Sequence, residues 1–223
     1  MHLSNPVVKN SDPIKEKRTS DLRLALTCPR RTRAKIASIA HLVIFLCGAL
    51  FLPLGSCDDF EDGCPPPQIY SECSHVTDYE DFRDQVKEGS DGETLVLCPF
   101  DLVKPDDASP AWIRSSTHIV CAEIGKCRIT GGGDHIKISG PDVESILQGF
   151  TFEGSDETAV RIWKNTPKMQ RICHNSFINN VTPRRGGALR AEVNTNISVG
   201  FCNFIQNESE QQGGGIYVYG KAT

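Results

Sequence analysis

The second half of the chain consists of short apolar segments separated by turn residues. Between Arg171 and Tyr219 these segments are three to five residues long and lie between Gly, Asn, Pro and Ser, a pattern typical of strands and turns. We expect strands at residues 171–173, 176–178, 188–190, 197–201 and 216–219.

A pair of motifs occurs twice in this region. FINN at 177–180 is followed by GGAL at 186–189, and FIQN at 204–207 is followed by GGGI at 213–216. Corresponding residues are 27 positions apart, and self-similarity at such a spacing predicts a solenoid. A weaker copy precedes it, with Phe150 aligned on Phe177 and residues 160–163 in place of the strand after the glycines. Residues 131–133 and 136–138 suggest one coil more.

A repeat of 27 residues accommodates three short strands and three turns, at about 3.3 Å per strand residue. It leaves no room for a helical crossover, which needs ten or more residues. The sequence therefore predicts an all-β chain, folded as a right-handed parallel β-helix with one coil per repeat.

The repeated residues have roles in such a coil. Each Phe is expected to point inward and stack on its counterpart. Each final Asn is expected at a turn, where it tolerates the left-handed conformation and its amide satisfies backbone groups, while the glycines allow a tight corner. These predicted scaffold residues are Phe177, Asn180, Gly186, Gly187, Phe204, Asn207, Gly213 and Gly214.

The two motif pairs resemble the F-x-x-N and G-G-A-[ILV] repeats of chlamydial polymorphic outer-membrane proteins. The wider stretch from Cys127 to Tyr219 is similar to right-handed β-helix proteins of the pectin-lyase-like superfamily. The resemblance covers about 95 to 130 of the 223 residues. It implies a fold and says little about activity, because this fold carries many unrelated functions.

The N-terminal part has a different composition. Residues 1–35 carry nine Lys or Arg and three Asp or Glu, and we expect a disordered basic tail in the cytoplasm. Residues 36–57 contain no Asp, Glu, Lys or Arg, lie between a basic and an acidic flank, and predict a transmembrane signal-anchor helix with the body outside or in a lumen. The alternative is a cleaved signal peptide and a secreted body.

The segments that follow lead into the β-helix. Residues 58–76 are an acidic, Pro-rich linker. Residues 77–89 predict a helix, with Thr77 and Glu80 as a capping box and Tyr79, Phe82 and Val86 on one face, which would cap the first coil. Residues 93–100 are expected as the first strand. The β-helix is expected over 92–223 and incomplete at its C-terminal end, since the chain stops directly after a strand.

Eight of the ten cysteines lie at or after Cys57, the last residue of the apolar segment, which predicts disulfides in an exported body. Cys121 and Cys127 flank a short turn-like segment and are the one pair that we favour. Export would also allow glycosylation at three sequons, those of Asn180, Asn196 and Asn207, of which Asn196 is favoured because the others are expected in turns.

Candidate chemistry is sparse. No complete catalytic set, cofactor motif or metal motif is present, although Asp134, Glu153, Asp156 and Glu157 are the carboxylates that a Ca²⁺-dependent lyase could use. Residues 36–223 carry 15 basic and 25 acidic residues, which argues against a nucleic-acid partner. Candidates for a ligand face are Arg161, Trp163, Arg190, Tyr217 and Tyr219, with Trp112 less certain.

Two functions remain open. The first is a non-catalytic binding or structural module at the cell surface, with a polysaccharide or protein partner and the membrane held through residues 36–57. The alternative is a polysaccharide lyase or glycoside hydrolase, or a fragment of one. Release of unsaturated or reducing sugars from a polymer would distinguish them.

Overall fold

The computed structural model describes residues 63–219. The tail predicted at 1–35, the membrane segment predicted at 36–57, the first residues of the predicted linker and residues 220–223 lie outside the described residues. Within 63–219, no helix has both the length and the apolar character needed to cross a bilayer.

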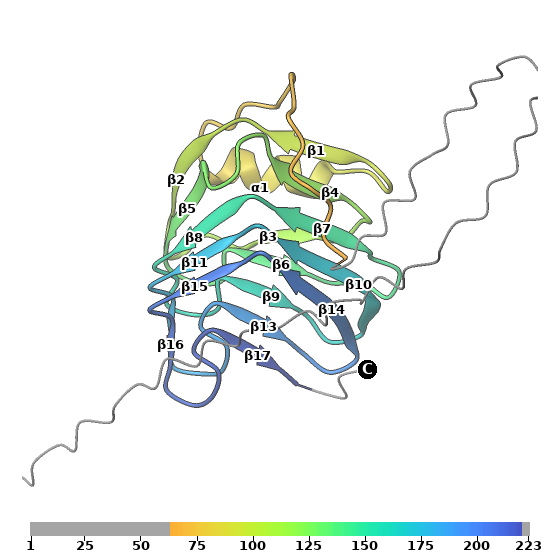
Figure 1. The fold of residues 1–223 in the computed structure, drawn as a ribbon. Coiled ribbons are helices and arrows are strands. Elements are labelled where there is room, and N and C mark those ends of the chain that lie inside the picture. The colour runs from red at the N-terminus through yellow and green to blue at the C-terminus, as the bar shows by residue number, and fades with distance from the viewer. Residues whose placement is uncertain (1–62, 220–223) are drawn as a thin grey trace, which may run out of the picture. The chain divides into compact units, whose positions relative to one another are not determined.

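The described chain forms a parallel β-solenoid of about five coils, each contributing one strand to each of three sheets (Figure 1). Sheet A contains β1 (Thr94–Leu97), β4 (His118–Cys121), β7 (Ser145–Gln148), β10 (Thr166–Cys173) and β14 (Thr195–Gly200). Sheet B contains β2 (Phe100–Lys104), β5 (Cys127–Gly131), β8 (Phe150–Glu153), β11 (Ser176–Ile178) and β15 (Asn203–Ile205). Sheet C contains β3 (Ala111–Ile113), β6 (Ile136–Ile138), β9 (Val160–Ile162), β13 (Leu189–Ala191) and β17 (Ile216–Val218). The short strands β12 (Val181–Thr182) and β16 (Glu208–Ser209) pair with each other. The prediction of an all-β parallel solenoid with one short helix is confirmed.

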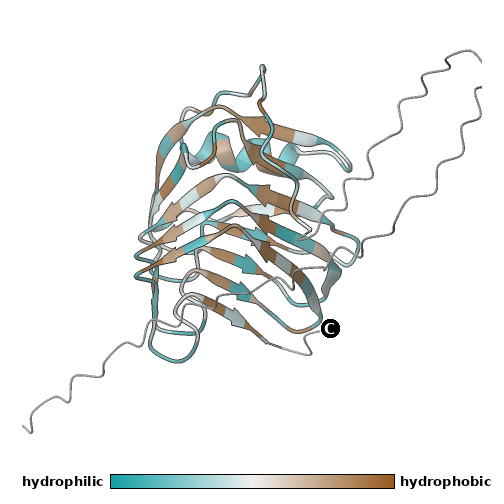
Figure 2. Cartoon of the chain, viewed as in Figure 1, coloured by the Kyte–Doolittle hydropathy of each residue, from teal (hydrophilic) through white to brown (hydrophobic). Residues whose placement is uncertain are grey.

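Apolar and polar residues alternate along many of the strands (Figure 2). Because successive side chains of a strand point to opposite faces, the apolar ones face the interior and the polar ones face outward. The inward side chains of successive coils stack in columns. In sheet B, Phe152, Phe177 and Phe204 are in register, with ring centroids 5.3 Å and 5.0 Å apart. Phe152 and Phe177 are fully buried, and burying each such side chain contributes about 1.5–3 kcal/mol.

The structure corrects the alignment of the earlier repeat. Phe177 pairs with Phe152 rather than with Phe150, so this coil is two residues shorter than the next one. Phe150 pairs with Cys127 instead, and its backbone N–H donates to the side chain of Asn175. Two phenylalanines separated by one residue leave the register ambiguous in the sequence, and the strand pairing decides it.

The left-handed corner residue precedes each repeated asparagine. Asn179 and Gln206 have φ values of 51° each, whereas Asn180 and Asn207 are not among the residues with positive φ. Asn180 is fully buried and accepts a hydrogen bond from Ser155 N–H (3.0 Å). Its Nδ2 donates to Asn207 Oδ1 (2.8 Å), so the two amides form a ladder between coils. This geometry agrees with the expectation that the amides satisfy backbone groups. The left-handed conformation, however, lies at Asn179 and Gln206, one residue before the predicted positions.

Helix α1 (Tyr79–Glu88) begins one residue later than the predicted capping box implies. Its N-cap is Asp78, whose side chain accepts a hydrogen bond from Asp81 N–H (2.9 Å). The Asp81 carboxylate in turn accepts from Thr77 N–H (2.9 Å). A carboxylate at the N-cap also interacts favourably with the helix dipole, which explains why Asp78 takes the position rather than Thr77.

The apolar face of α1 covers the first coil. Phe82 is fully buried, and its ring lies 5.8 Å from that of Phe100. The Tyr79 hydroxyl donates to His135 O (2.7 Å) and accepts from Ala111 N–H (3.0 Å). Burial raises the pKa of Tyr79, so the phenol remains a neutral donor at every ordinary pH. The helix therefore closes this end of the core.

Residues 63–73, which we call the strap, run along sheet A (orange in Figure 1). A disulfide joins Cys64 to Cys173 at the end of β10, and another joins Cys73 to Cys98 at the end of β1. The strap thus links the fourth coil to the first. Cys98 and Pro99 also form a corner that divides the strand predicted at 93–100 into β1 and the start of β2.

The third disulfide joins Cys121 to Cys127, the pair favoured from the sequence, with sulfur atoms 2.07 Å apart. It closes the corner between β4 and β5. Among the described cysteines, Cys202 has no disulfide partner, and burial raises the pKa of its thiol to about 11.

Candidate functional site

The side chains predicted to contact a ligand lie together on the outer face of sheet C. Arg161 of β9 pairs with Arg190 of β13, and Arg190 pairs with Tyr217 of β17. The same row continues toward α1, because Lys137 pairs with Arg161 and Trp112 with Lys137. Adjacent strands are about 4.8 Å apart, so the row spans about 19 Å. We call the row and its neighbours the sheet C stripe, which comprises Trp112, Arg114, Lys137, Arg161, Trp163, Arg185, Arg190, Tyr217 and Tyr219.

The two tryptophans of the stripe are surrounded by cations. Their ring centroids lie 6.5 Å apart, and Lys137 Nζ lies 5.5 Å from the ring of Trp112 and 5.9 Å from that of Trp163. The Arg114 guanidinium lies 4.7 Å from the Trp112 ring, and that of Arg161 lies 4.4 Å from the Trp163 ring. Cation–π contacts contribute about 0.5–1 kcal/mol each at exposed sites, so they hold the half-buried rings in place.

Two carboxylates, the buried Asp134 and the partly buried Glu192, position these cations. The Asp134 side chain is only 1% exposed, and its Oδ2 lies 2.7 Å from Lys137 Nζ and 3.6 Å from Arg161 Nη1. Its Oδ1 accepts a hydrogen bond from Thr158 N–H (3.1 Å). In the next coil, Glu192 Oε1 accepts from both Nε (2.9 Å) and Nη2 (2.6 Å) of Arg161. The stripe is therefore built before any ligand arrives.

The far end of the stripe is more exposed. Arg190 Nη2 lies 3.3 Å from Glu192 Oε1, and burial, together with the nearby Arg161, lowers the pKa of Arg190. Arg185 donates to the Tyr217 hydroxyl (2.8 Å) and lies 5.2 Å from its ring centroid. Tyr219 stacks on Tyr217 at 6.4 Å and is 53% exposed, so one aromatic ring remains open to solvent.

The stripe has the opposite charge to the chain. Its five cations and the two carboxylates that hold them leave a formal local charge of +3, whereas the whole chain carries −4. A local patch of one sign attracts ligands of the other sign over several ångströms. The net charge of the chain does not reveal this patch, where five cations meet only two carboxylates.

Sequence reasoning missed Lys137, Arg114 and Arg185 as members of the stripe. A usable signal was present at Lys137, because residues 136–138 (IKI), 160–162 (VRI) and 189–191 (LRA) share one pattern of apolar, cationic and apolar positions. Arg114 lies two residues after Trp112, just past the end of β3, whereas Arg185 lies outside the strands and only the folded chain brings it to the ring of Tyr217.

Three of the four acidic residues considered for calcium, Asp134, Asp156 and Glu157, interact electrostatically with Lys104. Asp134 also pairs with Lys137 and Arg161 of the stripe, Asp156 accepts a hydrogen bond from Gly133 N–H, and Glu153 binds Arg128 on sheet B (2.8 Å). Glu157 donates its backbone N–H to Ser155 Oγ (3.3 Å). Within residues 63–219, no three His, Cys, Asp or Glu side chains are grouped as a metal site.

The three sequons differ in their surroundings. Asn180 is fully buried and both coils around it use its amide, so the folded chain leaves no room for a glycan there. Asn207 is partly buried and donates to Phe177 O (2.9 Å). Asn196 lies in β14, a strand whose residues are all partly exposed, and remains the favoured site.

The two carboxylates beside the stripe, Asp134 and Glu192, are paired with its cations, so the groups that the stripe presents are cations and aromatic rings. In comparisons with known proteins, no family model, no curated protein and no solved structure matches this chain.

Proposed function

We propose that this chain is a non-catalytic binding module that holds an extended anionic polysaccharide along the sheet C stripe. The observation that carries the proposal is the recurrence of a cation or an aromatic ring on every coil of one face. Sugar rings stack on Trp and Tyr, and carboxylate or sulfate groups pair with Arg and Lys. A row with a regular spacing of about 4.8 Å favours a polymer over a small ligand.

The rigidity of the stripe supports the proposal. Arg161 makes two hydrogen bonds to Glu192, and Lys137 is paired with the buried Asp134. Side chains that are already ordered lose little entropy on binding, which increases the affinity for a given set of contacts.

The module, as we propose it, is a right-handed β-helix of the pectin-lyase-like type, with repeats similar to those of polymorphic outer-membrane proteins. We further propose that residues 36–57 anchor it in a membrane, or direct its secretion, so that the solenoid faces the exterior or a lumen. The apolar segment with its charged flanks supports this placement, and so do three disulfides, which persist in oxidising compartments.

The test compares the binding of polygalacturonate and heparin to the full chain and to three variants, Arg114→Gln, Arg185→Gln and Trp163→Ala. Arg128→Gln is the matched control, since it removes one positive charge from sheet B, where Arg128 is paired with Asp101 and Glu153. Each stripe variant should weaken binding by about tenfold, or roughly 1.4 kcal/mol. Added salt should weaken it further, because exposed charges are screened.

Several outcomes would contradict the proposal. Equal losses in Arg128→Gln and the stripe variants would mean that only the overall charge matters. Tighter binding of a single-stranded nucleic acid, which also uses cations and aromatic rings, would identify a different class of ligand. Release of unsaturated or reducing sugars would favour the lyase or hydrolase alternative.

A further inference from the structure

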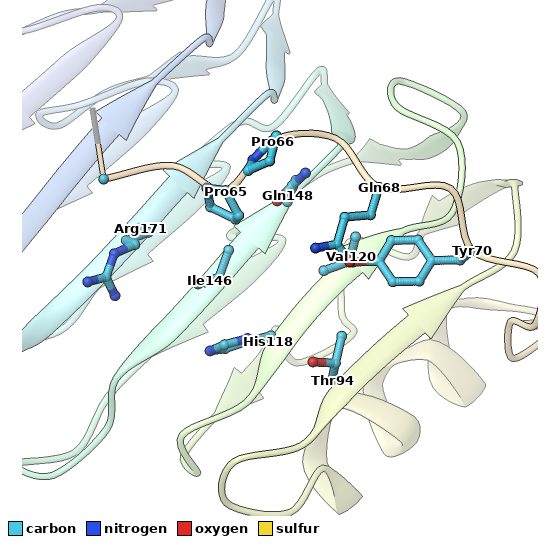
Figure 3. A pocket seen from close by; sticks show the side chains of 11 residues that line it. Pro65, Pro66, Gln68, Tyr70, Thr94, His118, Val120, Ile146, Gln148 and Arg171 are labelled. Carbon is cyan, nitrogen blue, oxygen red and sulfur yellow. The ribbon is translucent and has the colours of Figure 1, made fainter. Parts of the chain in front are cut away.

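A groove of about 530 Å³ lies between the strap and the outer face of sheet A, away from the stripe (Figure 3). This volume lies within the range of small-ligand sites in proteins. Figure 3 shows the strap beside the strands, with the side chains of the sheet pointing out toward it. Two other hollows in the described part of the chain are smaller, at about 240 Å³ and 290 Å³.

The floor of the groove is a row of four side chains from successive coils. Thr94 pairs with His118, His118 with Ile146, and Ile146 with Arg171. Three steps of about 4.8 Å make this row about 14 Å long. Val120 and Gln148 lie beside it, and the wall is formed by the strap residues Pro65, Pro66, Gln68 and Tyr70.

The two disulfides of the strap fix the width of the groove. Cys64 is bonded to Cys173 at one end, and Cys73 is bonded to Cys98 at the other. A wall that is covalently fixed at both ends does not have to be ordered by a ligand, so binding avoids that entropy cost.

The groove carries no unbalanced charge. Arg171 Nη1 lies 2.7 Å from Glu144 Oε1, outside the lining. Burial, and next the positive charge of Arg171, lowers the pKa of His118, so its imidazole is neutral near pH 7 and offers one donor and one acceptor. The amides of Gln68 and Gln148 and the hydroxyls of Thr94 and Tyr70 are neutral as well. Such a set does not select an anion or a cation.

Most of the backbone of the floor is not free to bind a ligand. A peptide that adds to a sheet uses the free N–H and C=O groups of an edge strand. Strands β4, β7 and β10 are each paired on both sides, and the edge strand β1 already accepts a hydrogen bond at Val96 O from Ser74 N–H (2.8 Å). Recognition therefore depends on side chains, namely amides, hydroxyls, an imidazole and a tyrosine ring beside apolar Ile146 and Val120. Hydroxyl groups and the apolar faces of sugar rings match this mixture.

We propose that the strap and sheet A form a binding site for a short neutral oligosaccharide, separate from the polymer site on sheet C. Tyr70 supplies a face on which a sugar ring packs, and the floor supplies donors and acceptors for its hydroxyls. The covalent anchors make the site depend on the oxidised state of the strap.

The test uses maltotriose, cellotriose and N-acetylchitotriose as probes, with calorimetry on the full chain. At least one should bind saturably, and Tyr70→Ala should weaken it by at least about tenfold. Ile69→Ala is the matched control, because Ile69 lies on the strap but is fully exposed and does not line the groove. Replacing Cys64 and Cys173 together by Ser, which frees the strap, should weaken binding, and far-ultraviolet circular dichroism of the same sample checks that the variant is folded.

Four results would overturn the proposal. The first is that none of the three probes binds saturably. The second is that Tyr70→Ala binds as well as the native chain, and the third is that Tyr70→Ala and Ile69→Ala lose the same affinity. The fourth is that the stripe variant Trp163→Ala loses binding. The last result would place the sugar on sheet C. Tyr70 is not part of the stripe, so Tyr70→Ala and the native chain should bind polygalacturonate equally. If polygalacturonate binds but none of the trisaccharides does, only the site beside the strap is refuted. If a trisaccharide binds but polygalacturonate does not, only the polymer site is refuted.

Discussion

Replacing Asn180 by Ala should destabilise the solenoid strongly, although Asn180 is far from any proposed ligand. Its Oδ1 accepts from Ser155 N–H, and its Nδ2 donates to Phe152 O (3.1 Å) and Asn207 Oδ1. Ser155 is 1% exposed, so water cannot replace the lost acceptor. An orphaned buried N–H costs about 1–3 kcal/mol, and two further hydrogen bonds contribute about 0.5–1.5 kcal/mol each. We expect a loss of about 3 kcal/mol.

Asn207→Ala is the matched control. Asn207 occupies the same place one coil later and also makes three hydrogen bonds, to Phe177 O and from the N–H and Nδ2 of Asn180. It is partly exposed, so water can replace some of these partners, and we expect a loss of about 1 kcal/mol.

Asn180→Asp tests whether the hydrogen bonds that Asn180 donates are needed as well as the one that it accepts. The carboxylate keeps the shape of the side chain and the acceptor for Ser155, but it has no N–H to donate to Phe152 O or Asn207 Oδ1. We therefore expect Asn180→Asp to be at least as damaging as Asn180→Ala at neutral pH.

The assay is urea unfolding followed by far-ultraviolet circular dichroism, on full chains made in a host that does not glycosylate asparagine. The midpoint and the slope give the free energy of unfolding. If Asn180→Ala and Asn207→Ala lose the same stability, or if Asn180→Asp is as stable as the native chain, the amide ladder is not the source of the stabilisation.

Three further predictions concern the scaffold. Burial lowers the pKa of His135 from 6.5 to about 4, so between these pH values the unfolded chain binds a proton that the folded chain does not. The free energy of unfolding should therefore be at its full value above about pH 6.5 and fall by about 3 kcal/mol as the pH drops to 4. Urea titrations across this range should show the loss in the native chain and not in His135→Asn. Replacing Cys64 and its partner by serine should cost about 5 kcal/mol, against about 2 kcal/mol for Cys121 and its partner, because the disulfides join residues 109 and 6 positions apart; similar losses in chemical denaturation would contradict this entropic account. Asp78→Ala should cost about 1 kcal/mol and Thr77→Ala less, and the reverse order would place the N-cap at Thr77.

The repeat made the fold predictable, and its irregularities limited the detail. Phe177 and Phe204 are 27 residues apart and pair in register, whereas Phe152 and Phe177 are 25 apart. A constant spacing selected Phe150 for the earlier coil because the sequence does not show how many residues each corner uses. The left-handed position was misplaced for a related reason, since FINN contains two adjacent asparagines and either can adopt it.

The candidate site was predictable where it follows the strands. Arg161 and Arg190 were both candidates for the ligand face, and they pair with each other in sheet C. Arg185 reaches Tyr217 from a loop, and the strap reaches sheet A through disulfides that sequence spacing does not specify. Contacts between segments far apart in the chain depend on the path of the backbone, and no local pattern encodes that path.

The strap gives the solenoid an uneven resistance to unravelling. In a stack of coils each coil contacts only its neighbours, so coils can detach one at a time from an open end. The disulfide at Cys173 ties the fourth coil back to the first, while the fifth coil, which begins at β14, lies beyond this clamp. A force applied to the C-terminal side of the described residues would therefore peel off the fifth coil and then β13 and β11 of the fourth at low load, and would stall at Cys173. Under tension, the oxidised chain would behave as an elastic segment joined to a rigid body that ends at β10.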